Sequence, residues 1–251
     1  MRIIFTLLVI TSSFIANISA FHLKTILPDL HTCPRSELQR CLPQSLESMK
    51  PYLAQGVPLL SIPAFEPYYI QLNKMIFTND FIPMIKFRDT FISGISKFRI
   101  SKVRVTDRND FIQFLAHFSL VRVSTTFNAF SSFVRMLTKS STYELNSILA
   151  DVVAEITIRG SNFGIEIESE QYFYVHNVTV RIRKIRDVKT EKQEKGNPKY
   201  LMQLTNDYLE VEWDTLTSEL IHNIQNIAAE IIQTISNKIY TSFPIHTLMT
   251  R

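Results

Sequence analysis

The last part of the chain contains a long run of apolar residues at helical spacing, and this run limits the possible folds more than any other feature. From Asp214 to about Tyr240 an apolar residue recurs every three or four positions, which predicts one long amphipathic helix. Asp214 is a candidate N-cap, and Pro244 lies just past the expected end. The apolar face contains Leu220, Ile224, Ile227, Ile231 and Ile235, with Ile221, Ala228, Ile232 and Ile239 beside them. A helix with so broad an apolar face needs a second layer to cover it.

The middle of the chain, from about Tyr68 to Glu212, reads mostly as β-strands. Apolar residues alternate with polar ones in FGIEIESE (163–170) and in VHNVTVRIRK (175–184), which is typical of strands with one buried face. We expect these two runs to pair as a hairpin through QYFY (171–174), with glutamates near arginines on a solvated outer face. A long helix covered by a curved, mostly antiparallel sheet is an α+β fold rather than an alternating α/β fold.

Some stretches depart from simple patterns. In SGISKFRISKVRVT (93–106) the apolar residues change parity, so we expect a β-bulge or bend near Ser101–Lys102. Residues 110–137 fit either a strand pair or a helix, and the charged residues 187–199 read as an exposed hairpin tip. Residues 38–53 have helical spacing, but Pro43 and Pro51 predict that this helix is short or kinked.

The first twenty residues have the form of a secretory signal peptide. Arg2 supplies a positive charge, residues 3–15 are apolar, and Ala20 ends the segment with a small side chain. The alternatives are a membrane anchor or a buried helix, but the apolar run is short for a membrane span, and no later segment approaches ~18 uninterrupted apolar residues. We therefore expect residues 1–20 to be a cleaved signal, and residues 21–251 to be one secreted domain without a transmembrane segment.

The two cysteines of the chain, Cys33 and Cys41, lie close together in CPRSELQRC. In an oxidising compartment such a pair predicts a disulfide. A zinc site normally has four ligands and only His31 lies nearby, while a redox centre usually has the CxxC spacing, which is absent. The Cys33–Cys41 bond would close a small loop and contribute about 2–3 kcal/mol, so the fold must depend on a hydrophobic core.

Charge and motifs argue against nucleic-acid binding and catalysis. The formal charge is +4, and Lys and Arg are spread along the chain, so we expect no nucleic-acid partner. The G-x-S-x-G and H-E-x-x-H motifs and a Gly-rich phosphate loop are absent, and the histidines lack metal-type spacing. We therefore expect that the protein is not an enzyme and holds no metal or cofactor. We also expect it to be a monomer. The sequon at Asn177 predicts glycosylation on the outer face.

Three stretches together resemble one known family. They are LPDLHTCPRSELQRCLPQSLESMKPYLAQGVPLLSIPAFEP (27–67), which has two early cysteines, KPYL, a G-[IV]-P step and an I-P-x-x-x-P run, then SGISKFRISKVRV, and finally IIQTISNKIYTSFPIHTL. Over its mature length the chain resembles the secreted arthropod takeout family, relatives of juvenile-hormone-binding proteins. The resemblance implies a TULIP-like fold, in which a strongly curved antiparallel sheet wraps one long helix and leaves a hydrophobic tunnel. It also implies carriage of a terpenoid hormone, a fatty acid or a similar lipid.

The same resemblance places the family's first disulfide on Cys33 and Cys41. A second disulfide, present in the hormone-binding relatives, cannot form, which favours the takeout branch. The middle of the chain departs from the family pattern, because Tyr143 is followed four residues later by Ser147 instead of glycine, and only Gly160 and Gly164 remain of the family's mid-chain glycines. Since such glycines permit sharp bends, their loss affects the expected shape of the tunnel.

Two interpretations of the apolar faces follow. In the first, helix and strands line a ligand tunnel, and the Tyr143 hydroxyl orients the ligand. The other candidate lining residues are Phe98, Ile100, Ile156, Ile158, Val178, Val180, Ile224, Ala228, Ile231 and Ile235. In the second, these residues form an ordinary packed core, and the protein is a secreted, non-catalytic interaction protein with a closed tunnel. Its partner would then be a receptor, another protein, or a membrane or microbial surface.

Overall fold

The computed structural model describes residues 23, 25–71, 75–76, 84–106, 108–130, 141–165, 170–195 and 213–250. The helices are α2 (Leu38–Gln55), α4 (Trp213–Tyr240) and α5 (Ile245–Leu248), with 3-10 turns at Arg35–Glu37 and Pro58–Leu60. The strands are β1 (Cys33–Pro34), β2 (Tyr68–Gln71), β3 (Met75–Ile76), β4 (Met84–Ser93), β5 (Phe98–Val105), β6 (Phe111–Phe130), β7 (Ser141–Ile165), β8 (Glu170–Lys184), β9 (Asp187–Lys195) and β10 (Met249–Thr250). The expected signal segment, residues 1–20, lies outside these ranges, so its cleavage stays a prediction.

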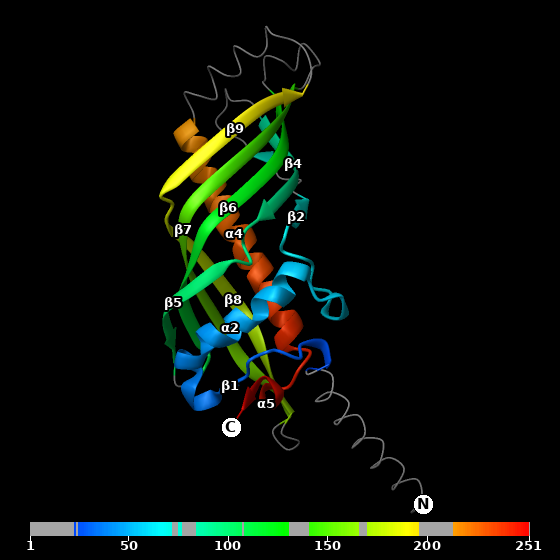
Figure 1. The fold of residues 1–251 in the computed structure, drawn as a ribbon, viewed down its shortest axis with the longest axis vertical. Coiled ribbons are helices and arrows are strands. Elements are labelled where there is room, and N and C mark those ends of the chain that lie inside the picture. Colours follow the sequence, from blue (N-terminus) through cyan, green and yellow to red (C-terminus); the bar gives the residue numbers. More distant parts are fainter. Residues whose placement is uncertain are drawn as a thin grey trace, which may run out of the picture.

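The eight-stranded sheet is antiparallel, and most of it consists of four rows: β4 followed by β5, then β6, then β7, then β9 followed by β8 (Figure 1). Strands β6 and β7 pair along their whole length and form its centre. On the outer side of β6, β4 and then β5 pair with successive parts of the strand, and on the outer side of β7, β9 and β8 do the same. The 25 residues of β7 extend over at most about 80 Å. The sheet therefore has a lower half, with β5 and β8 at its sides, and an upper half, with β4 and β9.

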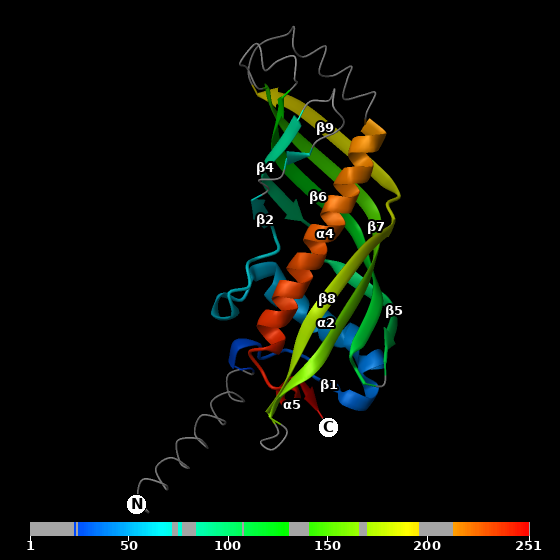
Figure 2. The same cartoon turned by 180° about the vertical axis from the view of Figure 1, so that it is seen from behind.

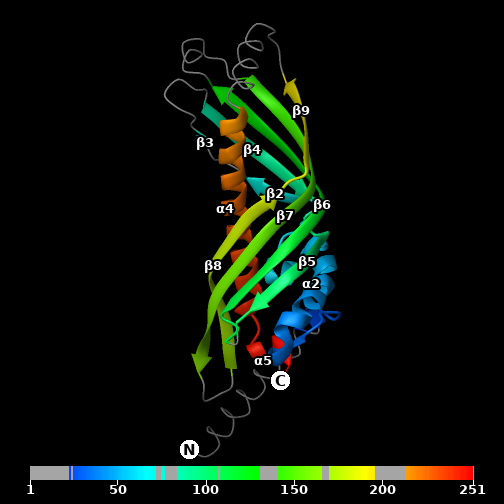
Figure 3. The ribbon, with the colours of Figure 1, turned by 90° about the vertical axis from the view of Figure 1, so that its left-hand side faces the viewer.

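The sheet curls around α4, which lies along its concave side (Figures 1 and 2). In the lower half α4 packs against β8, and α2 packs against β5 at the opposite edge of the sheet (Figure 3). The two helices meet through one apolar cluster that contains Met49 of α2 and Ile235 of α4. The structure confirms the predicted α+β fold and the long C-terminal helix.

A line of irregularity crosses the sheet between its two halves. The buried apolar residues of β6 are even-numbered up to Ala116 and odd-numbered from Val121, and those of β7 change from odd at Tyr143 to even from Val152. The change falls at Ser119 and Asp151, the one missing pair within the β6–β7 ladder, where Asp151 has a positive φ of 48°. Because successive side chains of a strand alternate between faces, such an irregularity moves the inward positions from one parity to the other.

The predicted bulge in β5 is confirmed. The β5–β6 register shifts between Ser101 and Arg104, and Lys102 has a positive φ of 52°. Residues 111–130 form one strand, which settles the ambiguity of residues 110–137 as far as Phe130, and residues 131–137 lie outside the described ranges.

Two other expectations were wrong in detail, and a third was wrong in part. Residues 175–184 pair with residues 153–160 and not with 163–167, and QYFY lies within β8 instead of forming the turn. The glutamate beside the arginines is therefore Glu155, whose carboxylate lies 2.7 Å from Arg183. Residues 187–195 form β9 and not a hairpin tip, because backbone pairing with β7 tolerates charged side chains on an exposed strand, and residues 196–199 lie outside the described ranges. Helix α2 is not short, because it continues through both prolines for 18 residues, and a kink at Pro43 or Pro51 stays a prediction.

The N-terminal segment is joined to the C-terminus at the lower end of the molecule. Cys33 and Cys41 form a disulfide with a Cα–Cα distance of 5.7 Å, which connects β1 to the first turn of α2. Strand β1 pairs in parallel with β10, Cys33 opposite Met249. The expected disulfide is thus present, and it holds the start of α2 next to the end of the chain.

Candidate functional site

The concave side of the lower half is filled by apolar side chains from the sheet and both helices. Four of the candidate lining residues, Ile156, Ile158, Val178 and Val180, are buried there and face one another across β7 and β8. Ile100 of β5 and Ala228 of α4 pack against the same cluster. These six candidates are brought together, and in the structure they contact one another and α2 as a packed core.

Two further candidates on α4 belong to a different cluster. Ile231 and Ile235 face away from the β7–β8 core, toward Met49 of α2 and toward Val57 and Ile62 of the segment that follows it. Helix α4 is thus apolar on two sides, one toward the sheet and one toward α2. This explains why its apolar stripe is broader than one packing partner requires.

Tyr143 lies in the upper half, where its ring is the last of three aromatic rings on three neighbouring strands. Its ring stacks on Phe127 of β6 at a centroid distance of 5.1 Å, and the Phe127 ring lies 5.7 Å from that of Phe87 of β4. The three residues are direct cross-strand partners, and Tyr143 is 1% exposed. Sequence reasoning missed Phe87 and Phe127, because only the register of β4, β6 and β7 places them beside Tyr143.

A pair of buried hydroxyls lies next to this aromatic row. The side-chain oxygens of Thr90 and Thr125 are 2.7 Å apart, and both residues are buried. Thr125 precedes Phe127 by two positions on β6, so the two side chains point to the same face of the sheet. The upper half therefore presents rings and hydroxyls on one inward face, which is a suitable lining for an apolar molecule with a polar end.

Two candidate lining residues are not buried with the others. Ile224 of α4 is 41% exposed. Phe98 of β5 is half-buried, its ring lies 6.3 Å from that of Phe118, and the Lys50 ammonium group lies 5.3 Å from its centroid. The structure therefore divides the candidates among the lower core, the α2–α4 cluster, the upper half and the surface.

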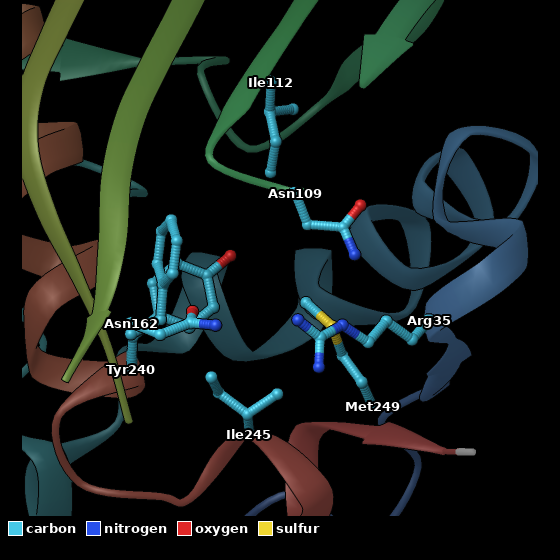
Figure 4. Close-up of a pocket in the computed structure, with 8 residues that line it drawn as sticks. Arg35, Asn109, Ile112, Asn162, Tyr240, Ile245 and Met249 are labelled. Atoms are coloured by element: carbon cyan, nitrogen blue, oxygen red, sulfur yellow. The ribbon is translucent and has the colours of Figure 1, made fainter. Parts of the chain in front are cut away.

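A small crevice opens at the lower end of the molecule (Figure 4). The space in and above this open crevice is about 340 Å³, solvent included, and its polar lining residues are Arg35, Asn109 and Asn162. Its apolar lining includes Phe173 and Tyr240, whose rings meet edge to face at 5.5 Å. Burial raises the pKa of the Tyr240 hydroxyl, which therefore stays neutral in the physiological range.

The outer face provides the expected position for a glycan. Asn177 is exposed on β8, and its side-chain oxygen accepts a hydrogen bond from the Thr179 hydroxyl at 3.3 Å. Within the described ranges, no group of three or more His, Cys, Asp or Glu side chains could hold a metal ion. None of the described helices is long and apolar enough to cross a membrane.

Comparisons with known proteins found one matching family model and several similar solved structures. The family model for haemolymph juvenile hormone binding protein matches residues 6–250. The crystal structure of Takeout 1 from Epiphyas postvittana is similar with a TM-score of 0.64 at 13% identity, covering 88% of this chain and 99% of that chain. The crystal structure of lipopolysaccharide binding protein matches with a TM-score of 0.41 at 13% identity, covering 83% of this chain and 40% of that chain. No curated protein sequence matches the chain.

Proposed function

The chain belongs to the haemolymph juvenile hormone binding protein family, and we propose that it is a secreted carrier of a small hydrophobic ligand. The ligand would be a terpenoid hormone, a fatty acid or a similar lipid, held in a tunnel between α4 and the curled sheet. The observation that supports this proposal best is the inward face of the upper half, where Phe87, Phe127 and Tyr143 form a continuous aromatic row beside two buried hydroxyls. Burial of apolar area would supply most of the binding free energy, at about 25 cal/mol per Å².

The two halves would have different roles in this carrier. Because the lower-half side chains already pack against one another, we propose that Ile156, Ile158, Val178 and Val180 form the closed end of the ligand space, together with Ile100 and Ala228. Tyr143 would line its other end and orient the polar group of the ligand. Ile231 and Ile235 would support α4 from behind, while Ile224 and Phe98 would lie at the margins.

Secretion is part of the proposal and is supported by three features. The first twenty residues have the pattern of a signal peptide. The Cys33–Cys41 disulfide fits an oxidising compartment. The sequon at Asn177 lies on an exposed strand face, where a glycan would not disturb the core.

Native mass spectrometry of the secreted, non-reduced protein, followed by organic extraction, tests the proposal. A discrete added mass that extracts as a fatty acid or a terpenoid is the expected result. A bare protein mass, with no uptake from a panel of apolar ligands, would contradict the carrier function. The mass of the protein itself would show whether residues 1–20 are removed, and a glycan would add further mass.

A second candidate function is favoured by the packing of the lower half. If the mutual contacts of Ile156, Val178 and Ala228 continue through the upper half, the tunnel is closed and the protein acts through its surface. It would then bind a receptor, another protein, or a membrane or microbial surface without carrying a ligand. The bare mass described above is the outcome that this candidate requires.

A further inference from the structure

The β7–β8 hairpin lies at the lower end of the molecule (Figures 1 and 3). Its outer face carries a cluster of exposed ring side chains. Phe163 of β7 and Tyr174 of β8 are 47% and 41% exposed. The Phe163 ring lies 5.8 Å from that of Tyr172 and 6.5 Å from that of Tyr174, to which it is almost perpendicular at 82°. The Tyr174 ring in turn lies 5.2 Å from the His176 imidazole. We call Phe163, Tyr172, Tyr174 and His176 the aromatic tip.

The strands that carry the aromatic tip have a second, inward face with a different role. Asn162 and Phe173, the neighbours of Phe163 and Tyr174 along the chain, line the crevice at the lower end. Because neighbouring side chains on a strand point to opposite faces, the hairpin has its apolar packing on one side and exposed rings on the other. The rings of the tip are therefore not needed to fill the core, and an exposed apolar cluster of this kind marks an interaction surface.

The charge around the tip indicates what this surface attracts. Glu170 lies on β8 two positions before Tyr172, and the described residues 160–165 and 170–176 contain no lysine or arginine, although the whole chain has a formal charge of +4. Within the described residues, the Tyr172 hydroxyl donates a hydrogen bond to the Glu170 carboxylate, which holds a negative charge beside the rings. Aromatic faces next to a carboxylate attract a cation, most strongly a quaternary ammonium group whose methyl groups also contact the rings.

We propose that the aromatic tip docks the protein on a lipid surface by binding the choline head groups of phosphatidylcholine. The trimethylammonium group is the outermost part of such a surface and would lie between the Phe163 and Tyr174 rings. Tyrosine rings are also suited to the boundary between head groups and water, where the ring is half-buried and the hydroxyl stays hydrated. The Glu170 carboxylate opposes binding to an anionic lipid surface. The proposal rests on the carrier function, because docking would place the lower end of a carrier against its source or acceptor of ligand.

Binding of the full secreted protein to vesicles tests this inference. Flotation with vesicles of phosphatidylcholine should recover the wild type, and vesicles of phosphatidylglycerol should recover less of it. The double variant F163A/Y174A should lose about tenfold in affinity for phosphatidylcholine, because two ring contacts with the cation disappear. E170Q should give a smaller loss in the same direction, because its rings remain.

Tyr69 and Phe91 supply a matched control on another part of the sheet. They are also exposed, their rings lie 5.1 Å apart, and the Tyr69 hydroxyl donates to Asp89 at 2.6 Å. The variant Y69A/F91A should bind vesicles like the wild type, because its two rings are tilted by only 42° and do not form the near-perpendicular corner of Phe163 and Tyr174. Both double variants should keep the thermal unfolding transition. Equal loss in both variants, undiminished binding by F163A/Y174A, absence of wild-type binding or a preference for phosphatidylglycerol would each overturn the proposal. A wild type recovered only by a lysine-rich protein surface would also overturn it.

The same preparations distinguish failure of docking from failure of the carrier function. Organic extraction measures ligand content without vesicles, and F163A/Y174A should retain as much ligand as the wild type. Vesicle binding by a protein without ligand would leave the aromatic tip in place and remove the carrier function. A protein that contains ligand but does not bind vesicles would keep the carrier function and remove the docking role of the aromatic tip.

Discussion

Asn237 of α4 binds both backbone groups of Val175 on β8. Its side-chain oxygen accepts a hydrogen bond from the Val175 N–H at 2.7 Å, and its side-chain nitrogen donates to the Val175 carbonyl at 3.0 Å. Gln233 donates to the carbonyls of Val175 and His176, and Gln225 accepts from the Ile182 N–H. Since β8 lies at the end of the strand order, the helix amides occupy positions that a further strand would otherwise fill. The polar side of α4 is therefore rich in amides because it binds a strand edge.

The variant N237A should lower the free energy of unfolding by about 1–3 kcal/mol, because it leaves the N–H of the fully buried Val175 without the Asn237 oxygen that accepts its hydrogen bond. Urea unfolding followed by circular dichroism measures this change. Asn226, on the same helix, is exposed and contacts His222, so N226A is the matched control and should change stability by less than about 0.5 kcal/mol. Equal effects of the two variants would show that the amide contacts with β8 do not stabilise the fold.

Glu66 gives a pH-dependent contribution to stability. Its carboxylate accepts hydrogen bonds from the Gly94 N–H at 2.6 Å, the Ser96 N–H at 2.9 Å and the Ser96 hydroxyl at 2.7 Å. Burial raises the pKa of Glu66, but these hydrogen bonds and the nearby Lys97 outweigh it, and the net pKa is lowered. A lowered pKa in the folded state means that the stabilisation is present above the unfolded pKa of about 4.3 and is lost as the pH falls through the folded pKa.

We therefore expect the stability difference between wild type and E66Q to be largest near neutral pH and to shrink below about pH 4. Urea unfolding across this range measures the difference. E47Q is a suitable control, because Glu47 is a surface carboxylate whose partner is Lys50 on the same helix. A difference between wild type and E66Q that stays constant with pH would contradict the assignment of this pH dependence to Glu66.

The sequence predicted the elements whose pattern is local and continuous. Helix α4 repeats its apolar stripe over many turns, and the β5 bulge follows from a parity change within eight residues. The change of parity at Ser119 and Asp151 could not be predicted from either strand alone. The inward positions of β6 and β7 change parity at the same pair of residues, so the β6–β7 register is the same on both sides of it. The aromatic row of Phe87, Phe127 and Tyr143 was missed for a similar reason. These residues are far apart in the sequence, and only the pairing of three strands brings them together.

Removal of the disulfide in C33S/C41S should lower the free energy of unfolding by about 2–3 kcal/mol, as expected for a cross-link that closes a short loop. The effect should be local, because the disulfide joins β1 to α2 and β1 pairs with β10. Hydrogen exchange should therefore increase first at β1, β10 and the start of α2, while α4 and the centre of the sheet keep their protection. Increased exchange across the whole sheet would mean that the bond supports the core directly.

Tyr143 allows the ligand site and the packed core to be separated by substitution. In Y143F the ring that stacks on Phe127 is kept and only the hydroxyl is removed. If the hydroxyl orients a ligand, Y143F should lower the affinity for a fatty acid about 2- to 12-fold, the range of one hydrogen bond, and should not change the affinity for a hydrocarbon of equal length. In contrast, I156A should lower the free energy of unfolding by about 2–5 kcal/mol, because it removes side-chain volume from the lower core. Displacement of a fluorescent fatty acid and urea unfolding measure the two effects, and Y174F, a surface tyrosine, is the control for binding. Equal loss for fatty acid and hydrocarbon in Y143F would place the hydroxyl outside the ligand site, since loss of a polar contact affects only the ligand that has a polar group.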